Sequence, residues 1–244
     1  MKKLFKSLQK KNFEILMLHH AEAILSHDMP EALSEIDAVL SNFSIPVGEL
    51  VYGGGGEGDM TQRLRRDLAL QGWGKHNFIV RKVIDGVDRE SISHEIDHVK
   101  HFETGTAALE IEWNNKDPFF DRDLENFKRL HADGAISIGC IITRGTTLQD
   151  SLRQIVATFA TKNGIAKLED LSPYYTPTPR QRTNISKAEK SKGGFAEGWA
   201  HVFVSDKFGE ATTHWRKLQD RMLRGVGNPC PLLLIGLPAE IVVP

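Results

Sequence analysis

The middle of the chain alternates apolar and polar residues with the period of a β-strand. In the segment "GTAALEIEW", Leu109 and Ile111 alternate with Glu110 and Glu112, so a strand would place the apolar side chains on one face and both carboxylates on the other. The run "AISIGCIIT" at 135–143 is almost continuously apolar, which is typical of a strand that is covered on both faces.

A segment with helical periodicity separates these two strands. Phe120, Leu124 and Phe127 form one apolar stripe, Pro118 suits a first helical turn, and Gly134 follows the last turn. A strand, a helix and a second strand form a βαβ unit, so we predict an α/β fold with a central mixed sheet flanked by helices. The remaining pattern predicts helices at 30–43, 146–164 and 210–225, strands at 199–205 and 230–243, and an irregular, basic segment at 173–194.

The composition is ordinary for a soluble globular protein and carries no strong overall charge. The 244 residues are 40% hydrophobic and 26% charged, and the formal net charge is −1, so binding to nucleic acid must come from local basic clusters. No linker separates two cores, and we expect a single domain over 1–244. Two cysteines are too few for a disulfide framework or a cysteine-based zinc site. The chain shows neither a signal peptide nor an apolar stretch long enough to cross a membrane, which favours the cytoplasm.

The stretch "HEIDH", residues 94–98, matches the HExxH motif of zinc hydrolases and has the form found in peptide deformylases. On a helix, His94 and His98 would share one face, with Glu95 beside a metal-bound water. The third ligand has only weak candidates, such as His101, and the other segments expected of a deformylase do not match. A zinc hydrolase is therefore the alternative enzyme hypothesis; otherwise the histidines are polar or DNA-facing side chains.

Asp97, in the same stretch, offers a different chemistry together with Glu110 and Glu112. Two carboxylates at positions i and i+2 of a strand repel each other, so solvent counterions, an arginine or a divalent cation must balance them. With Asp97 arriving from just upstream, they would form the oxygen cluster that Mg²⁺ prefers. Bound Mg²⁺ can lower the pKa of an attacking water and neutralise charge on a phosphate. The alternative is a solvated acidic edge strand.

The segment "EIDHVKHFETGTAALEIEWNNKD" resembles the active-site strands of the PD-(D/E)xK nucleases, and most of all the type II restriction endonucleases BglII and BamHI. The similarity extends through "HHAEAIL" and "IITRG" and covers roughly residues 19–145. Two departures stand out: Glu112 occupies the position where most members have lysine, and the connection between Asp97 and Glu110 is longer than in BglII. The matching positions are Ile96-Asp97, Glu110-Ile111-Glu112 and Trp113-Asn114-Asn115.

This resemblance implies a PD-(D/E)xK restriction-endonuclease-like fold and a Mg²⁺-dependent type II endonuclease that cuts double-stranded DNA at a short, specific, palindromic site. It implies that Asp97 and Glu110 bind the metal, and that Glu112 is either a general base or a further ligand. It also implies a homodimer in which each subunit cuts one strand, and functional pairing with a DNA methyltransferase. A catalytically inactive DNA-binding relative is the non-enzyme alternative.

DNA recognition requires basic side chains for phosphates, and amides or guanidinium groups for bases. We expect DNA-contacting loops near 52–66 and 173–194; in the first, four glycines without a Walker lysine predict a loop that leads into a basic helix. Asn114 and Asn115 match positions close to the bases in the resembled enzyme, although turn formation would also explain them. The DNA-binding candidates are Asn114, Asn115, Lys116, Arg63, Arg66, Arg180, Arg182, Asn184 and Lys187.

Overall fold

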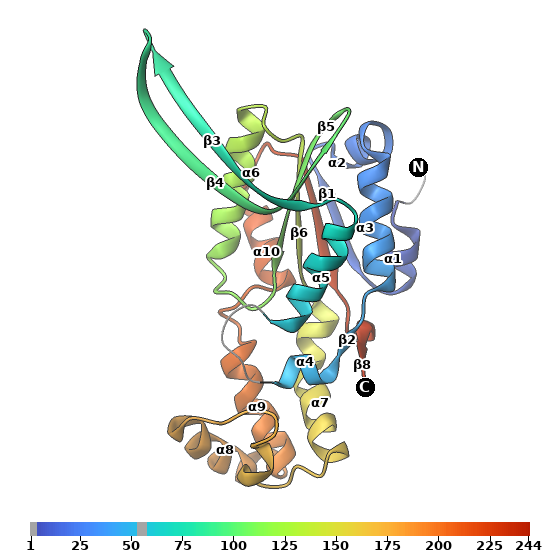
Figure 1. The fold of residues 1–244 in the computed structure, drawn as a ribbon. Helices are drawn as coiled ribbons and strands as arrows, with labels where there is room; N and C mark the ends of the chain where they lie inside the picture. The colour runs from blue at the N-terminus through green and yellow to red at the C-terminus, as the bar shows by residue number, and fades with distance from the viewer. Residues whose placement is uncertain (1–3, 53–57) are drawn as a thin grey trace.

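A six-stranded mixed sheet runs through the protein (Figure 1), which we describe from a computed structural model that covers residues 4–52 and 58–244. The strand order is β1-β7-β6-β5-β4-β3; the central strands β7, β6 and β5 are parallel, whereas β1, β4 and β3 pair antiparallel with their neighbours. The predicted α/β fold with a mixed sheet is confirmed. The strands are β1 (Glu14–Leu18), β3 (Gly74–Ile84), β4 (Val87–Phe102), β5 (Gly105–Glu112), β6 (Ile138–Arg144), β7 (Leu232–Leu237) and a separate parallel pair, β2 (Ile45–Pro46) with β8 (Val242–Val243).

Helices flank the sheet and continue beyond one end of it (Figure 1). The helices predicted to begin near residues 30, 118, 146 and 210 are present as α3, α6, α7 and α10. The glycine-rich loop expected at 53–56 lies outside the described residues. Within the described residues, no helix is both long and apolar enough to cross a membrane. The helices are α1 (Lys6–Lys10), α2 (Ala21–Ala23), η1 (Ile24–Asp28), α3 (Pro30–Asn42), α4 (Val47–Val51), α5 (Asp59–Leu70), α6 (Phe119–Ala132), α7 (Thr146–Lys162), η2 (Leu168–Leu171), α8 (Pro179–Lys192), α9 (Phe195–Lys207), α10 (Trp215–Leu223) and η3 (Ala239–Ile241).

Each face of the central strands has its own hydrophobic cluster. Ala108 and Ile141 belong to a cluster that includes the apolar side chains of α6 and α10, whereas Leu109 and Ile142 belong to the cluster with α3, α5 and α7. Burial on both faces explains why β6 and β7 are continuously apolar. It also means that the carboxylates of β5, which alternate with Leu109, point to the α6 side of the sheet.

A glycine sets how closely α6 approaches this sheet. A Cβ atom at Gly139 would lie 2.4 Å from the aromatic ring of Phe127 on α6, a distance that no relaxed structure tolerates. A larger residue would therefore push α6 away from β6. Any side chain that α6 directs toward the neighbouring strand β5 would move with it.

The segment 173–194 is not the irregular loop that its prolines and basic residues predicted. It contains helix α8, which packs against α9 at the far end of the molecule from the β3–β4 hairpin (Figure 1). The side chain of Thr178 accepts a hydrogen bond from the Gln181 N–H, and the Gln181 side chain accepts one from the Thr178 N–H. This capping box, with Pro179 in the first turn, starts a helix. The prediction is wrong because these local signals outweigh the composition.

The predicted strand at 199–205 is also wrong, because this segment lies inside helix α9. Trp199 and Phe203, one helical turn apart, are both buried in the cluster that includes α7. A short, continuously apolar run fits a helix buried on several sides as well as a strand. Gly198 permits close packing, since a Cβ there would lie 2.5 Å from the backbone nitrogen of Glu189 on α8.

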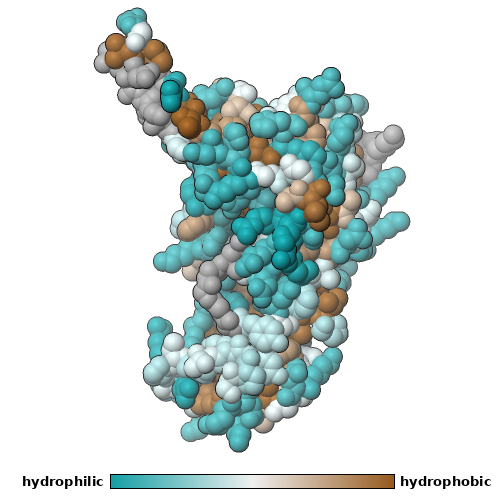
Figure 2. All heavy atoms as spheres, in the orientation of Figure 1, coloured by the Kyte–Doolittle hydropathy of each residue, from teal (hydrophilic) through white to brown (hydrophobic). Residues whose placement is uncertain are grey.

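Strands β3 and β4 project beyond the sheet as a long two-stranded arm (Figure 1). Strand β4 pairs with β5 from His98 to Phe102, so the rest of its length pairs with β3 alone. Ile79, Val83 and Val87 are largely exposed on this arm, and Figure 2 shows hydrophobic side chains close to its tip. The inner end of the arm is the part that reaches the carboxylates of β5.

We predict that neither cysteine reacts in the folded protein. Cys140 and Cys230 are free and buried, and burial raises the pKa of both thiols, that of Cys230 to about 12. Ellman's reagent should therefore label almost no thiol under native conditions and both thiols in guanidinium chloride. Rapid labelling of the native protein would show that one of these thiols is accessible.

Candidate active site

The junction between β4 and β5 brings Asp97 next to Glu110. The last regular pair between these strands is His98 with Leu109, and one step further the N–H of Asp97 donates to Oε1 of Glu110 over 3.4 Å. The register of β4 against β3 shifts at the same place, which is how a β-bulge re-aims a side chain. The Asp97 side chain is exposed, whereas its neighbour His98 is buried.

Glu110 and Glu112 lie side by side on the α6 face of β5, as their spacing predicts. Their exposed fractions are only 5% and 2%. Burial, reinforced by the negative charges of Asp123 and Asp97, raises the pKa of Glu110 to about 9. Burial also raises the pKa of Glu112 to about 8, again with Asp123 adding to the effect. Without a cation, both groups hold their protons near neutral pH.

Asp123 on α6 completes this group and was not singled out from the sequence. It is 1% exposed, and burial raises its pKa. Its interaction with the neighbouring carboxyl group of Glu112 raises the pKa of Glu112 further. A signal did exist: Asp123 falls inside the apolar stripe of Phe120, Leu124 and Phe127, where an acid is out of place.

Arg122 is the cation closest to these acids in the described structure. Its Nη2 lies 2.8 Å from Oδ1 of Asp123 and 3.6 Å from Oε1 of Glu112. On the other side, Nδ2 of Asn115 donates to Oε2 of Glu112 over 2.9 Å. One guanidinium group cannot balance four neighbouring carboxyl groups, so ionisation of the cluster requires additional positive charge.

The donor chemistry of the cluster suits a divalent cation. All its ligating atoms are hard carboxylate oxygens, and Oδ2 of Asp123 and Oγ1 of Thr143, both buried, have no hydrogen-bond partner among the described residues. Thr143 pairs with Glu112 in the β5–β6 register and therefore shares its face. The described residues do not, as they stand, gather three or more ligating side chains around one point. The acids would therefore have to lose protons and move together to hold an ion.

The HExxH motif does not form a zinc site. His94 and His98 lie on strand β4, where residues four apart are separated by about 13 Å, instead of on one face of a helix. Nδ1 of His94 is 2.9 Å from Oδ1 of Asn126 on α6, and Nδ1 of His98 is 3.2 Å from the carbonyl oxygen of Leu109 on β5. Each histidine has its own structural partner, and the zinc-hydrolase hypothesis is wrong.

The segment after β5 presents the predicted base-reading residues next to the acids. The side chains of Asn114, Asn115 and Lys116 are exposed. The carbonyl oxygen of Asn115 accepts a hydrogen bond of 2.8 Å from the Thr213 N–H. Lys116 forms an antiparallel β-bridge with Thr212. The backbone of this turn is thus held in place, with the side chains of Asn114 and Lys116 exposed and the amide of Asn115 directed at Glu112.

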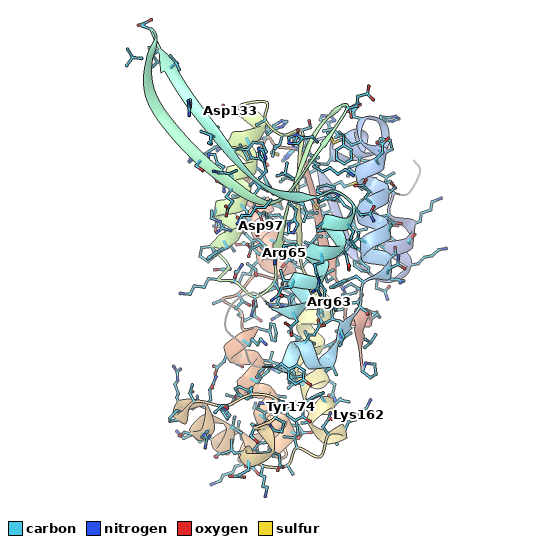
Figure 3. The ribbon with its side chains drawn as sticks, in the orientation of Figure 1. Arg63, Arg65, Asp97, Asp133, Lys162 and Tyr174 are labelled. Carbon is cyan, nitrogen blue, oxygen red and sulfur yellow. The ribbon has the colours of Figure 1, made fainter. Side chains whose placement is uncertain are left out.

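Helix α5 carries the predicted arginines at the edge of the site. Both Nε and Nη2 of Arg63 bond to the carboxylate of Glu49, at 2.8 Å and 3.0 Å, so its charge is already neutralised. Arg66 is exposed. Figure 3 shows Arg65 between Arg63 and Asp97 in this view, and its charge acts on Lys75 of β3. Arg63 therefore keeps little charge for a polyanion, whereas Arg66 faces solvent.

The predicted residues on α8 are not close to the acids. Arg180, Arg182 and Lys187 are exposed, and Asn184 is half-buried; Nε of Arg182 also donates to the carbonyl oxygen of Pro177 over 3.2 Å. Figure 1 places α8 at the opposite end of the molecule from the β3–β4 arm, with the sheet between them. A ligand that contacts both α8 and the carboxyl cluster must therefore be long.

Comparison with known proteins identifies the family. A search among curated proteins gives no match. A scan against protein families matches residues 13–237 to the family described as restriction endonuclease BglII/BglIII. This region contains the β4–β5 acids, Asp123 and helix α8. Because the match extends over nearly the whole chain, the protein belongs to the BglII/BglIII family of type II restriction endonucleases.

Proposed function

We propose that the protein hydrolyses phosphodiester bonds of double-stranded DNA at a short, specific, palindromic site, with Mg²⁺ as its cofactor. The observation that carries this proposal is the hydrogen bond from the Asp97 backbone N–H to the Glu110 carboxyl group across the β4–β5 junction, with Glu112 buried on the same face as Glu110. Restriction endonucleases generally use a divalent metal, and among the described residues the Arg122 guanidinium group cannot by itself offset the charge of these acids.

In this proposal Asp97 and Glu110 hold the ion, and Glu112 either joins them or acts as the base. Bound Mg²⁺ supplies an acidified water and neutralises the phosphate. The water oxygen forms a bond to phosphorus, one P–O ester bond breaks, and the leaving oxygen takes a proton from solvent. Where Glu112 acts as the base, its Oε1 accepts the proton of the water, and Asn115 fixes the carboxyl group through the other oxygen.

DNA contact in this proposal divides between bases and phosphates. Asn114 and Asn115 read base edges, as amides do with adenine, and Lys116 contacts the backbone beside them. The phosphate contacts come from α5, through Arg66 and the remaining N–H groups of Arg63, and from α8. The α8 contacts are Arg180, Arg182, Asn184 and Lys187.

The assembly follows from the symmetry of a palindromic target. A homodimer would place one acidic cluster on each strand of the DNA. We further propose that the whole chain acts as one restriction-endonuclease-like domain in the cytoplasm, with DNA contacts in the regions 52–66 and 173–194, and that a DNA methyltransferase protects the host's own sites. These points rest on the family and the sequence pattern.

The first test is cleavage of plasmid DNA. With Mg²⁺, the wild-type protein should produce discrete fragments, whose mapped ends give the target and the cut position. Replacing Asp97 or Glu110 with alanine should lower the single-turnover rate by at least about a hundredfold, because each ligand supports charge in the transition state, while DNA binding persists. Asp133→Ala, at the exposed end of α6 (Figure 3), is the control. Intact plasmid with wild-type protein would instead favour the inactive DNA-binding relative.

The second test is thermal unfolding of metal-free protein. The folded pKa of Glu110 is about 9, above the ordinary value of 4.5, so this group contributes stability below pH 4.5 that is lost as pH rises toward 9. Glu110→Gln should therefore raise Tm at pH 8 by several degrees, since each kcal/mol shifts Tm by about 2–4 °C in a domain of this size.

The difference between the Glu110→Gln variant and the wild type should grow from pH 5 to pH 9, and Mg²⁺ should stabilise the wild type more than the variant. Glu103→Gln, an exposed carboxylate in the β4–β5 turn, should change neither the pH profile nor the response to Mg²⁺. If Glu110→Gln unfolds at the wild-type temperature throughout this range, burial does not disfavour the ionised form of the Glu110 carboxyl group.

The third test concerns α8. Arg182→Ala and Lys187→Ala should weaken binding to all DNA sequences alike and reduce the slope of log affinity against log salt by about 0.9 for each phosphate contact removed. Lys162→Ala, an exposed lysine at the end of α7 (Figure 3), should leave the slope unchanged. Fluorescence anisotropy in Ca²⁺ across a salt series measures this. Equal slopes for all four proteins would remove α8 from the DNA interface.

A further inference from the structure

Arg122 has three fixed contacts that hold its guanidinium group at the mouth of the carboxyl cluster. Its Nε donates to Oδ1 of Asp123 over 2.8 Å, and its Nη2 reaches the same oxygen and Oε1 of Glu112. Its Cζ also lies 4.4 Å from the centre of the Phe119 ring, one turn earlier on α6. A guanidinium group restrained on three sides loses little freedom when it binds a ligand.

The open side of the same group points away from these contacts. The Arg122 side chain is 54% exposed, whereas the side chains of Glu112 and Asp123 that anchor it are 3% and 1% exposed. No described residue accepts a hydrogen bond from its Nη1. Planar guanidinium groups with free N–H donors favour phosphate oxygens. The guanidinium group therefore presents Nη1 to solvent while its Nη2 lies 3.6 Å from a carboxylate oxygen that the proposed reaction uses.

The start of α6 makes the surroundings more favourable for an anion. Arg122 lies in the first turn of a 14-residue helix, at the positive end of the helix dipole. Lys116, exposed just before the helix, adds a further cation. These features matter because the neighbouring acids would otherwise repel a phosphate.

We propose that Arg122 is a catalytic residue that contacts the scissile phosphate and stabilises the negative charge that builds up on its non-bridging oxygens during hydrolysis. This inference rests on the proposed endonuclease function. Asp123 is then a positioning residue, since its buried carboxylate fixes the guanidinium group. Strand β5 provides only carboxylates, Glu110 and Glu112, beside the reacting water. Arg122 on α6 supplies the positive side chain there.

The test compares Arg122→Gln and Arg122→Lys with Arg129→Gln. Arg129 is exposed on the same helix and pairs with Glu125 alone, so its loss should change nothing. On a duplex that carries the mapped site, Arg122→Gln should lower the saturating single-turnover rate in Mg²⁺ by about 10²–10³-fold, the usual effect of one donor to a transition-state oxyanion. Affinity in Ca²⁺ should fall much less. Arg122→Lys should retain part of the rate, because lysine keeps the positive charge but lacks the paired N–H donors of a guanidinium group.

A second measurement separates contact with the phosphate from support of the acids. In EDTA, where no metal ion contacts the phosphate, a duplex with an uncharged methylphosphonate at the scissile link should bind wild-type protein several-fold more weakly than the normal duplex, and Arg122→Gln should bind both equally. The inference fails if Arg122→Gln cuts at the wild-type rate, or regains that rate when the Mg²⁺ concentration is raised. It also fails if the variant changes sequence preference instead of rate, or if it still discriminates between the two duplexes. If wild-type protein cuts no DNA, the endonuclease proposal and this inference fall together.

Discussion

Three carboxyl groups buried together between a strand and a helix are the constraint on which this structure depends. Glu110 and Glu112 point from β5 toward α6, and Asp123 points from α6 toward β5. Taking several ionisable acids out of water costs free energy unless they stay protonated or gain a cation. Hydrophobic clusters on both faces of the sheet hold the acids in place. The fold thus accepts local instability at a place where a charged ligand can relieve it.

The fold keeps this strained group rigid by fixing the backbone on both sides of it. Strand β5 is central and buried, and just beyond its end the carbonyl oxygen of Trp113 accepts a hydrogen bond from the Arg144 guanidinium group. Arg144 is fully buried, and its other donors bond to Gln149 at the start of α7 and to Thr212. Its hydrogen-bond partners are all neutral, and burial lowers its pKa to about 9. One side chain therefore links β5, β6, α7 and the segment before α10, which also holds the Asn114–Lys116 turn.

The sequence predicted the architecture well where periodicity and chain order agree. The alternation at Leu109–Glu112 and the stripe of α6 were sufficient for the βαβ unit, and the same alternation predicted that the two glutamates share a face. Segments without a clean period were predicted less well. The apolar run in α9 fits either a helix or a strand, and proline with basic residues masked the capping box of α8. Asp123 was missed because its role depends on packing: only the approach of α6 to β5 shows that an acid in an apolar stripe meets Glu112.

An acidic centre in a chain of net charge −1 sets a problem for any protein that binds DNA. The acids repel the phosphate on which they would act, so affinity must come from cations placed elsewhere. The exposed cations of α8 lie far from the acids, whereas those of α5 lie at the edge of the site (Figures 1 and 3). Such an arrangement separates binding from chemistry: distant cations hold the polyanion. The field at the reacting phosphate then becomes attractive only where a metal ion and an anchored arginine offset the carboxylates. In the absence of metal, the protonated acids and the Arg122 pair leave the cluster close to neutral, which explains how the protein can fold around it.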